Sequence, residues 1–251
     1  MILNYHRPDT VEEALFLVSR TDVKTFPMGG GTWLNQPRTE SYEVVDLQNL
    51  GLDQVEDRGN LLEIGATVIL QGLLEISNLQ PGLVAAIRHE VSHNLRQAAT
   101  IAGTLVASDG RSPLTTALLA LDISLTLLPG EEQVELGNIL PFRMERLVRR
   151  LITKVSIPLN ASLAYQYVAR SPVDQPIVCA VVSRWPSGRT RVALGGYGKS
   201  PAMVFDGTED SGVVEAARDA YSHAGDQWAS AEYRREIAGV LTARCLQEFE
   251  K

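Results

Sequence analysis

Hydrophobic positions along the chain recur with helical spacing in some segments and with strand spacing in others. In residues 10–20, apolar side chains stand three and four positions apart behind a capping residue, which predicts a helix. The same spacing predicts further helices over residues 68–75, 83–93, 113–121, 213–221 and 232–247. Short apolar or alternating runs predict strands over residues 24–28, 42–47, 61–66, 123–128, 178–184 and 189–194. This mixture predicts an α+β fold.

The character of the chain changes near residue 158, where we expect a domain boundary. After this point the chain begins with strand-like runs joined by a hairpin signal at residues 185–188. We therefore expect a first domain over residues 1–158, itself in two parts over about 1–55 and 56–158. A smaller α+β domain is expected over residues 159–251.

Composition restricts the possible functions. The 251 residues are 45% hydrophobic and 21% charged, which is typical of a globular protein. A net charge of -7 disfavours general binding of nucleic acid. The two cysteines, Cys179 and Cys245, are too few for a disulfide scaffold, or for an iron–sulfur cluster, which needs about four thiolates. Without a signal peptide, or an apolar run near the roughly 20 residues that span a bilayer, we expect a cytoplasmic protein with no membrane partner.

Three consecutive glycines, Gly29 to Gly31, follow an extended segment and precede Thr32. Without side chains, their backbone N–H groups can turn toward one point and approach a ligand closely. Such a loop with a threonine hydroxyl suits a diphosphate, although it is neither the spaced-glycine dinucleotide motif nor a P-loop. A flexible turn is the alternative interpretation of the same residues.

A second candidate loop covers residues 100–104 and leads toward Ser112 and Pro113. Its small residues and hydroxyls would let a planar aromatic ligand lie against the backbone. The alternative is a buried turn followed by a helix that Ser112 caps and Pro113 begins. His89 and His93 stand four residues apart, which a zinc site could use, but no third ligand is indicated, so we expect them on a solvated helix face.

The order of these segments resembles the FAD-binding (medium) subunit of molybdenum hydroxylases, the carbon monoxide dehydrogenase and xanthine dehydrogenase flavoprotein family. The matching segments, in chain order, are residues 5–8, 28–32, 45–47, 63–67, 95–104, 118–122, 151–158, 193–201 and 233–235. Each segment alone is unspecific, whereas their common order over nearly the full length is specific.

The resemblance implies a two-part FAD-binding domain of the vanillyl-alcohol-oxidase (PCMH) type, followed by a smaller α+β domain. It also implies an oxidoreductase subunit in a multi-subunit complex, a flavoprotein that is not active on the organic substrate by itself. A molybdopterin large subunit would react with that substrate, and an iron–sulfur small subunit would carry electrons to the flavin. The flavin would pass them to NAD or another acceptor, while the protein supplies position and electrostatics.

The resemblance assigns the cofactor contacts as well. The family's diphosphate loop corresponds to residues 29–32, and its flavin loop to residues 100–104. We further expect Trp33 to cover one side of the ligand and Ile152 to contact its adenine or flavin region. The complete expected set contains no catalytic residue and no metal ligand, and comprises Met28, Gly29, Gly30, Gly31, Thr32, Trp33, Thr100, Ile101, Ala102, Gly103, Thr104, Asp109, Ile152 and Tyr167.

Several positions depart from the family pattern. Ala102 stands where glycine is usual, and Thr104 where asparagine is usual. A family aspartate aligns with Pro113, with Asp109 nearby, and a family lysine aligns with Gln166 or Tyr167. These departures leave a second hypothesis open, a scaffold or assembly subunit that has lost FAD. A vanillyl-alcohol-oxidase-type enzyme with its own substrate is disfavoured, because little chain remains after residue 158 for a substrate-binding region.

Overall fold

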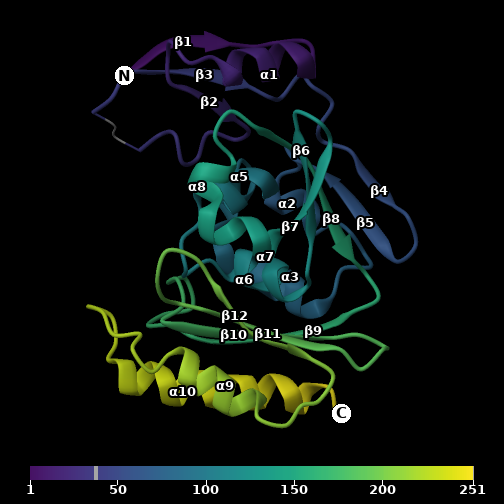
Figure 1. The fold of residues 1–251 in the computed structure, drawn as a ribbon, viewed down its shortest axis with the longest axis vertical. Helices are drawn as coiled ribbons and strands as arrows, with labels where there is room; N and C mark the ends of the chain where they lie inside the picture. Colours follow the sequence, from purple (N-terminus) through teal and green to yellow (C-terminus); the bar gives the residue numbers. More distant parts are fainter. Residues whose placement is uncertain (37–38, 251) are drawn as a thin grey trace. The chain divides into compact units, whose positions relative to one another are not determined.

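The computed structural model describes residues 1–36 and 39–250, which form two compact units (Figure 1). The first unit comprises Met1–Glu75, His93–Ala107 and Ile123–Ile157. The second comprises Ile76–Ser92, Ser108–Asp122 and the chain from Pro158 onward. Each unit therefore draws on three separate stretches of sequence. The contiguous division at residue 158 stays a prediction.

The first unit begins with a three-stranded parallel sheet of order β1–β3–β2. Its elements are β1 (Ile2–His6), α1 (Val11–Ser19), β2 (Thr25–Met28) and β3 (Tyr42–Asp46). The Thr10 side chain caps α1 by accepting the Glu13 backbone N–H at 3.2 Å. Since parallel strands end at the same edge, the loop that follows β2 leaves from the carboxyl edge of this sheet, a common place for ligand sites.

A five-stranded sheet of order β4–β5–β8–β6–β7 forms the other half of the first unit. Its strands are β4 (Val55–Asp57), β5 (Leu61–Gly65), β6 (Ser124–Leu128), β7 (Glu132–Glu135) and β8 (Leu151–Pro158). Along β6, Leu125 and Leu127 are buried, while the other three residues of the strand are partly exposed. This alternation is typical of a sheet with one covered face. The remaining elements are α2 (Leu70–Leu73), α4 (His93–Arg96), α5 (Ile101–Ala107), α7 (Leu136–Ile139), the 3-10 turn η1 (Leu140–Phe142) and α8 (Arg143–Arg146).

The second unit is built on an antiparallel sheet of order β12–β11–β10–β9. Its strands are β9 (Ser162–Val168), β10 (Val178–Arg184), β11 (Thr190–Gly195) and β12 (Ala202–Gly207). Its helices are α3 (Pro81–Glu90), α6 (Pro113–Ala120), α9 (Val213–Ala220) and α10 (Ala231–Glu248). In Figure 1 the sheet lies between α9 and α10 on one side and α3 and α6 on the other.

Strand β10 explains why this sheet is covered on both faces, since every residue from Val178 to Ser183 is buried. Val178, Ala180 and Val182 share a hydrophobic core with α9 and α10. On the opposite face, the Cys179 thiol lies 3.8 Å from the Thr116 hydroxyl, and Ser183 Oγ donates to the Ala120 carbonyl at 2.6 Å. Both partners belong to α6, whose residues are all buried.

Each helix and strand that we expected from the hydrophobic pattern is present, but several limits differ. The helix expected over 68–75 is reduced to α2, and the one expected over 83–93 ends at Glu90. The latter begins earlier, at Pro81, because proline is well suited to the first turn of a helix. A loop was expected over residues 100–104, but residues 101–107 form α5.

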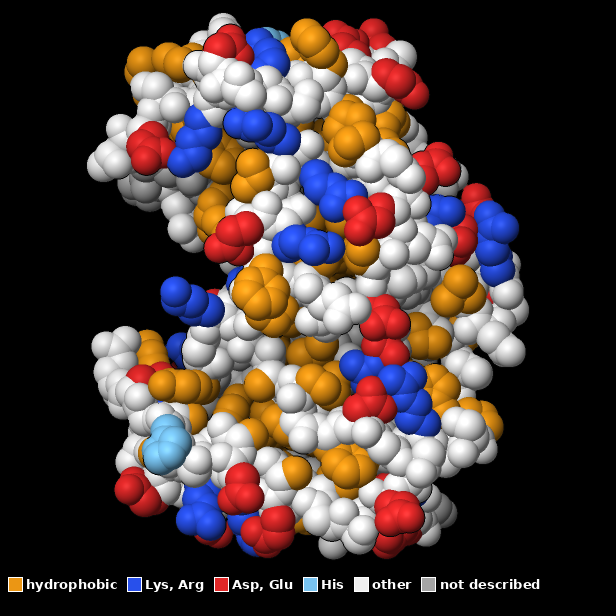
Figure 2. All heavy atoms as spheres, viewed as in Figure 1, with side chains coloured by type: hydrophobic (Ala, Val, Ile, Leu, Met, Phe, Trp, Pro, Cys, Tyr) orange, Lys and Arg blue, Asp and Glu red, His pale blue; other side chains and the backbone are white. Residues whose placement is uncertain are grey.

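The distribution of surface charge, the length of the helices and the grouping of possible metal ligands were compared with what nucleic acids, membranes and metal ions require. On the face shown in Figure 2, acidic and basic side chains are interspersed with apolar ones rather than gathered in one large field. None of the helices in the described ranges combines the length and apolar character that crossing a bilayer requires. The same ranges contain no group of three His, Cys, Asp or Glu side chains placed to hold a metal ion.

Candidate cofactor site

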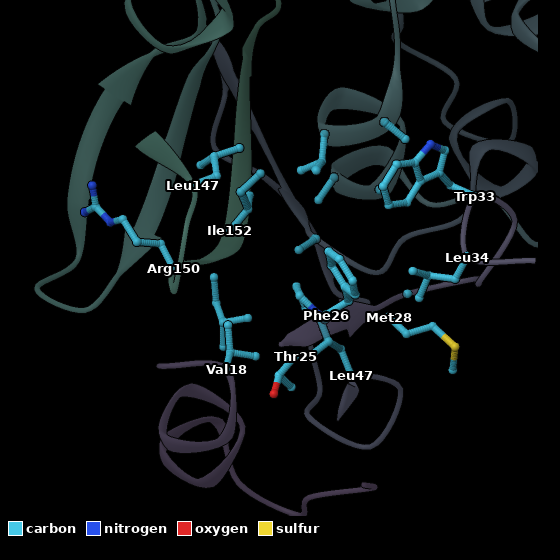
Figure 3. A pocket seen from close by; sticks show the side chains of 18 of the residues that line it. Val18, Thr25, Phe26, Met28, Trp33, Leu34, Leu47, Leu147, Arg150 and Ile152 are labelled. Atoms are coloured by element: carbon cyan, nitrogen blue, oxygen red, sulfur yellow. The ribbon is translucent and has the colours of Figure 1, made fainter. Parts of the chain in front are cut away.

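The first unit contains a cavity of about 600 Å³, within the size range of small-molecule sites. Its walls come from the end of α1, from β2 and the loop that follows it, from the start of α5, and from the segment between α8 and β8 (Figure 3). Ten of the residues expected at the cofactor line it, namely Met28, Gly29, Gly30, Gly31, Thr32, Trp33, Thr100, Ala102, Gly103 and Ile152.

The glycine loop packs directly against the segment before α5. A Cβ atom on Gly29 would lie 2.6 Å from Thr100 Oγ1, and one on Gly30 would lie only 1.5 Å from the Ala98 carbonyl oxygen. Gly31 has a φ of +69°, a conformation that other residues adopt at a cost. Side chains are therefore excluded at the first two positions, which leaves the backbone itself as the wall of the cavity.

The backbone donors of this loop have no partner within the part of the chain that the structure describes. The N–H groups of Gly29, Gly30, Gly31 and Thr32 donate to no described backbone or side-chain acceptor. Backbone N–H groups in partly buried loops normally find a partner, since leaving them unpaired is costly. Four unpaired donors in succession on a cavity wall have the chemistry to bind an anion such as a phosphate.

Basic side chains line the same cavity. They are Arg20, Lys24, Arg143, Arg149 and Arg150, and no aspartate or glutamate is among the described lining residues. Arg20, Lys24 and Arg150 pair with glutamates that do not line the cavity. The lining itself is therefore basic, which favours an anion over a cation. The residues of the cavity thus fit the diphosphate of FAD by their donors and by their charge.

Apolar side chains form the remaining wall, as Figure 3 shows. Phe26 stands edge-on to Trp33, with ring centroids 6.2 Å apart, and edge-on to Tyr42 at 5.3 Å. Ile152 and Leu147 lie on the α8–β8 side of the cavity. These flat and branched groups suit a planar heteroaromatic ring. Phe26 and Leu147 were not expected at the site, although the strand that carries Phe26 was predicted.

The second expected loop has a different structure from the one predicted. Residues 101–104 are the first turn of α5, and Thr100 Oγ1 caps it by accepting the Gly103 N–H at 3.2 Å. Ile101 is fully buried, and Thr104 Oγ1 donates to the Thr100 carbonyl at 2.9 Å, so neither residue lines the cavity. Gly103 and the small neighbouring side chains concealed the helix, because glycine disfavours helices.

Two other expected contacts, Asp109 and Tyr167, belong to the second unit. Asp109 Oδ1 accepts the Arg111 backbone N–H at 2.8 Å. Tyr167 lies on β9, stacked on Tyr165 at 5.5 Å and against the His89 ring at 4.0 Å. Their part in cofactor binding stays a prediction.

His89 does not lie on a solvated helix face as expected. It is half-buried, which lowers its pKa, and its Nε2 lies 2.9 Å from the Asp174 carbonyl oxygen. A carbonyl only accepts, so Nε2 carries the proton and Nδ1 accepts from the Tyr165 hydroxyl at 2.6 Å. The aromatic contacts with β9, which sequence spacing does not reveal, account for this burial.

Glu43, at the centre of the parallel sheet, holds Arg20 at the edge of the cavity. The carboxylate accepts from Asn4 Nδ2 at 2.6 Å and lies 2.7 Å from His6 Nε2, and it also pairs with Arg20. The Glu43 pKa is lowered to about 2, mainly by the hydrogen bond from Asn4, then by the one from His6, with a further contribution from Arg20. This carboxylate therefore stays ionised throughout the neutral range.

We expect the parallel sheet to lose stability in acid because of Glu43. The folded-state pKa of Glu43 lies below the unfolded value of 4.5, so its contribution is complete above pH 4.5 and is lost as pH falls toward 2. Amide hydrogen exchange in β1 and β3, compared between the wild type and Glu43→Gln, measures this effect. The wild type should lose protection over this range, and Glu43→Gln should show a weaker pH dependence. Identical profiles for the two proteins would contradict it.

The family of the chain follows from the stretch that carries the cavity. Residues 1–160 match the model of the FAD binding domain in molybdopterin dehydrogenase. The chain belongs to this family. FAD is the cofactor of this domain, and the chain is an FAD-binding subunit of the molybdenum hydroxylase type, within an oxidoreductase family.

Relatives match over nearly the whole length. The chain is 30% identical to the protein YgfM of Escherichia coli (strain K12) over 249 residues, 97% of this chain and 95% of that protein. It is 26% identical to the nicotine 6-hydroxylase medium subunit of Paenarthrobacter nicotinovorans over 273 residues, covering 98% of this chain and 96% of that one. A chain of the reconstituted CO dehydrogenase from Oligotropha carboxidovorans shares the fold, with a TM-score of 0.83 at 22% identity over 97% of this chain and 96% of that chain. The fold class and the family expected from the sequence are thus confirmed.

Proposed function

We propose that the chain is the electron-transfer flavoprotein subunit of a molybdenum hydroxylase-type complex. In this role it holds FAD as a relay between an iron–sulfur small subunit and NAD or another acceptor. A molybdopterin large subunit carries out the reaction with the organic substrate. The name of one relative, a nicotine 6-hydroxylase medium subunit, supports a place in such an assembly. Two buried cysteines support it too, because the chain needs a partner to supply iron–sulfur clusters.

Among the described residues, the observation that carries this proposal is the row of unpaired backbone donors at residues 29–32, on a cavity that no carboxylate lines. Backbone N–H groups bind a diphosphate without the loss of conformational entropy that ordering long side chains would cost. The loop is already held against Ala98 and Thr100. The basic side chains around them add long-range attraction. When bound, FAD supplies the capacity to accept and release one or two electrons.

The other lining residues position the ligand. Arg20, fixed by Glu43, offers a positive charge at the edge of the cavity, and the Phe26 and Ile152 side chains exclude water from a planar ring. In this proposal Trp33 covers the ligand from the loop side. The chain itself thus binds and shields the cofactor and leaves the substrate reaction to another subunit.

We expect FAD to stabilise the purified chain and to quench its tryptophan fluorescence. FAD at about one hundred times its Kd contributes about 2.7 kcal/mol, or a rise in Tm of roughly 5–10 °C for a chain of this size. ADP should compete with FAD, whereas riboflavin, which lacks the diphosphate, should bind much more weakly. Trp33→Phe should reduce the quenching and leave the shift in Tm largely in place.

The same titration separates the relay from the cofactor-free scaffold suggested by Ala102 and Thr104. A chain that copurifies with an iron–sulfur and a molybdopterin subunit, yet shows no flavin absorbance and no shift in Tm with FAD, would be the scaffold. A chain that binds FAD and in which the bound flavin is reduced when substrate is added to the assembled complex is the relay.

A further inference from the structure

The second unit contains a separate cavity of about 330 Å³ that the FAD proposal does not use. It lies where the segment after β9 meets the segment before α10 and the loop before α6. The residues that line it are Arg111, Arg170, Val173, Asp174, Gln175 and Trp228. This composition is unusual for a small surface cavity, because two arginines stand beside one indole.

Both guanidinium groups lie over the same aromatic ring. The Cζ atoms of Arg111 and Arg170 are each 4.7 Å from the centroid of the Trp228 ring. An indole stabilises a cation over its face, but two cations on one indole repel each other. An anion in the cavity would reduce this repulsion and would be attracted by both charges.

The groups around the cavity are held in place before any ligand binds. Arg111 donates through Nε to the Pro176 carbonyl at 3.0 Å and through Nη2 to the Gln175 carbonyl at 2.7 Å. His89 fixes the same segment from another side through the Asp174 carbonyl. This pre-organisation lowers the entropic cost of binding.

The tryptophan is fixed as well. The Trp228 backbone N–H donates to Asp226 Oδ1 at 2.7 Å, and Asp226 pairs at 2.9 Å with Arg234, which is fully buried. A buried arginine of this kind is a rigid anchor, because displacing it would leave a charge without a partner. The indole and the Arg111 guanidinium therefore present a defined surface.

Two charged groups in the cavity have no ion-pair partner among the described residues. Arg170 is exposed and lies over the Trp228 ring, and Asp174 lines the same cavity; within the described ranges neither side chain forms a salt bridge. Arg111, Arg170 and Asp174 together give the cavity an excess of one positive charge. Asp174 would repel a second anion close to it but would accept a hydrogen bond from a hydroxyl.

We propose that this cavity is a binding site for a phosphate group, either free phosphate or the phosphate of a nucleotide. A planar guanidinium group matches the oxygens of a phosphate, and both arginines line the cavity. The Asp174 carboxylate accepts a hydroxyl, either the P–OH of inorganic phosphate or a ribose hydroxyl beside the phosphate of a nucleotide. This site does not depend on FAD binding in the first unit.

Calorimetric titration of the chain with potassium phosphate tests the proposal, with potassium chloride at equal ionic strength as the reference. Excess FAD is present throughout, so that the glycine loop of the first unit is filled. We expect saturable binding at one site that Arg170→Gln weakens about ten-fold or more. Arg235→Gln, at an exposed arginine of α10 in the same unit, is the matched control and should not change the affinity. Asp174→Asn keeps an acceptor oxygen for the hydroxyl but removes the negative charge that repels the phosphate, so it should tighten binding several-fold.

Titration with AMP distinguishes the two sources of phosphate. AMP that binds more tightly than phosphate, with the same dependence on Arg170, identifies a nucleotide as the ligand. AMP that binds equally or more weakly identifies free phosphate. Absence of saturable binding by either, or binding that Arg170→Gln leaves unchanged, overturns the proposal. Because the decision rests on Arg170, the result is independent of whether the first unit binds FAD.

Discussion

Gly30→Ala should lower the affinity for FAD by at least about a hundred-fold, the loss expected when two or more hydrogen bonds to a charged group are broken. The added methyl group would lie 1.5 Å from the Ala98 carbonyl oxygen, a backbone atom that cannot rotate away. The loop must therefore move away from the segment before α5, and its unpaired N–H groups move with it. Fluorescence titration with FAD measures the change.

A glycine elsewhere in the same unit provides the control. Gly72 lies in α2, and a Cβ atom there would be no closer than 3.6 Å to a side chain, so Gly72→Ala should leave FAD affinity unchanged. If Gly30→Ala fails to fold, Gly29→Ala keeps the test decisive, because its clash is with the Thr100 side chain at 2.6 Å. Adding Thr100→Ala removes that clash and should restore part of the affinity. Full affinity in Gly30→Ala would show that the loop does not hold the diphosphate.

Raising the pH from 5 to 8 should lower the free energy of unfolding through Glu90, and Glu90→Gln should remove this decrease. Glu90 is buried in the second unit, and burial raises its pKa to about 7, although Ser112 Oγ and the Leu114 N–H donate to its Oε2 at 2.8 and 2.9 Å. The folded-state pKa lies above the unfolded value of 4.5, so the protonated group is tolerated and ionisation is penalised. The contribution is complete below pH 4.5 and is lost as pH rises through about 7. The difference corresponds to about 3 kcal/mol.

Urea denaturation at pH 5 and pH 8 measures this effect. Glutamine keeps the shape and the acceptor oxygen of Glu90 but cannot ionise, so the variant should be more stable than the wild type at pH 8 and similar to it at pH 5. Glu236→Gln, at an exposed position of α10, controls for the removal of one negative charge. Parallel pH profiles for the wild type and Glu90→Gln would contradict the assignment.

The part of the site that could be predicted from the sequence is the part made of backbone. Consecutive glycines after a strand indicate a loop that a ligand can approach, and the structure confirms both the strand and the close packing at Gly29 and Gly30. Such a loop can be recognised from the local sequence alone, since its backbone N–H groups do not depend on any distant residue. Trp33 and Ile152 were found through the resemblance and do line the cavity.

The other features depend on contacts between distant segments. Phe26 is half-buried in a short strand, and nothing in its sequence neighbourhood shows that it contacts Trp33 and Tyr42. The sequence does not distinguish Glu43 from other charged residues in strands, because its partners Asn4, His6 and Arg20 come from β1 and the end of α1. Helix α5 was concealed because Gly103 and neighbouring small residues have weak helix signals, and tertiary packing overrides them. The cavity at Trp228 likewise combines three segments that are far apart in the sequence.

The interleaved composition of the two units affects how the chain is made. Helix α6 is buried along its whole length against strands β10 and β11, which the ribosome releases more than fifty residues later. Until then its leucines and alanines have no surface to cover them. The five-stranded sheet of the first unit is likewise incomplete until β8, which lies between β5 and β6, has been synthesised. The second unit therefore cannot complete its core until the last part of the chain has been synthesised. A gene cut at residue 158 would leave a first fragment in which α3 and α6 have lost the sheet that covers them, and a second fragment whose sheet lacks these two helices.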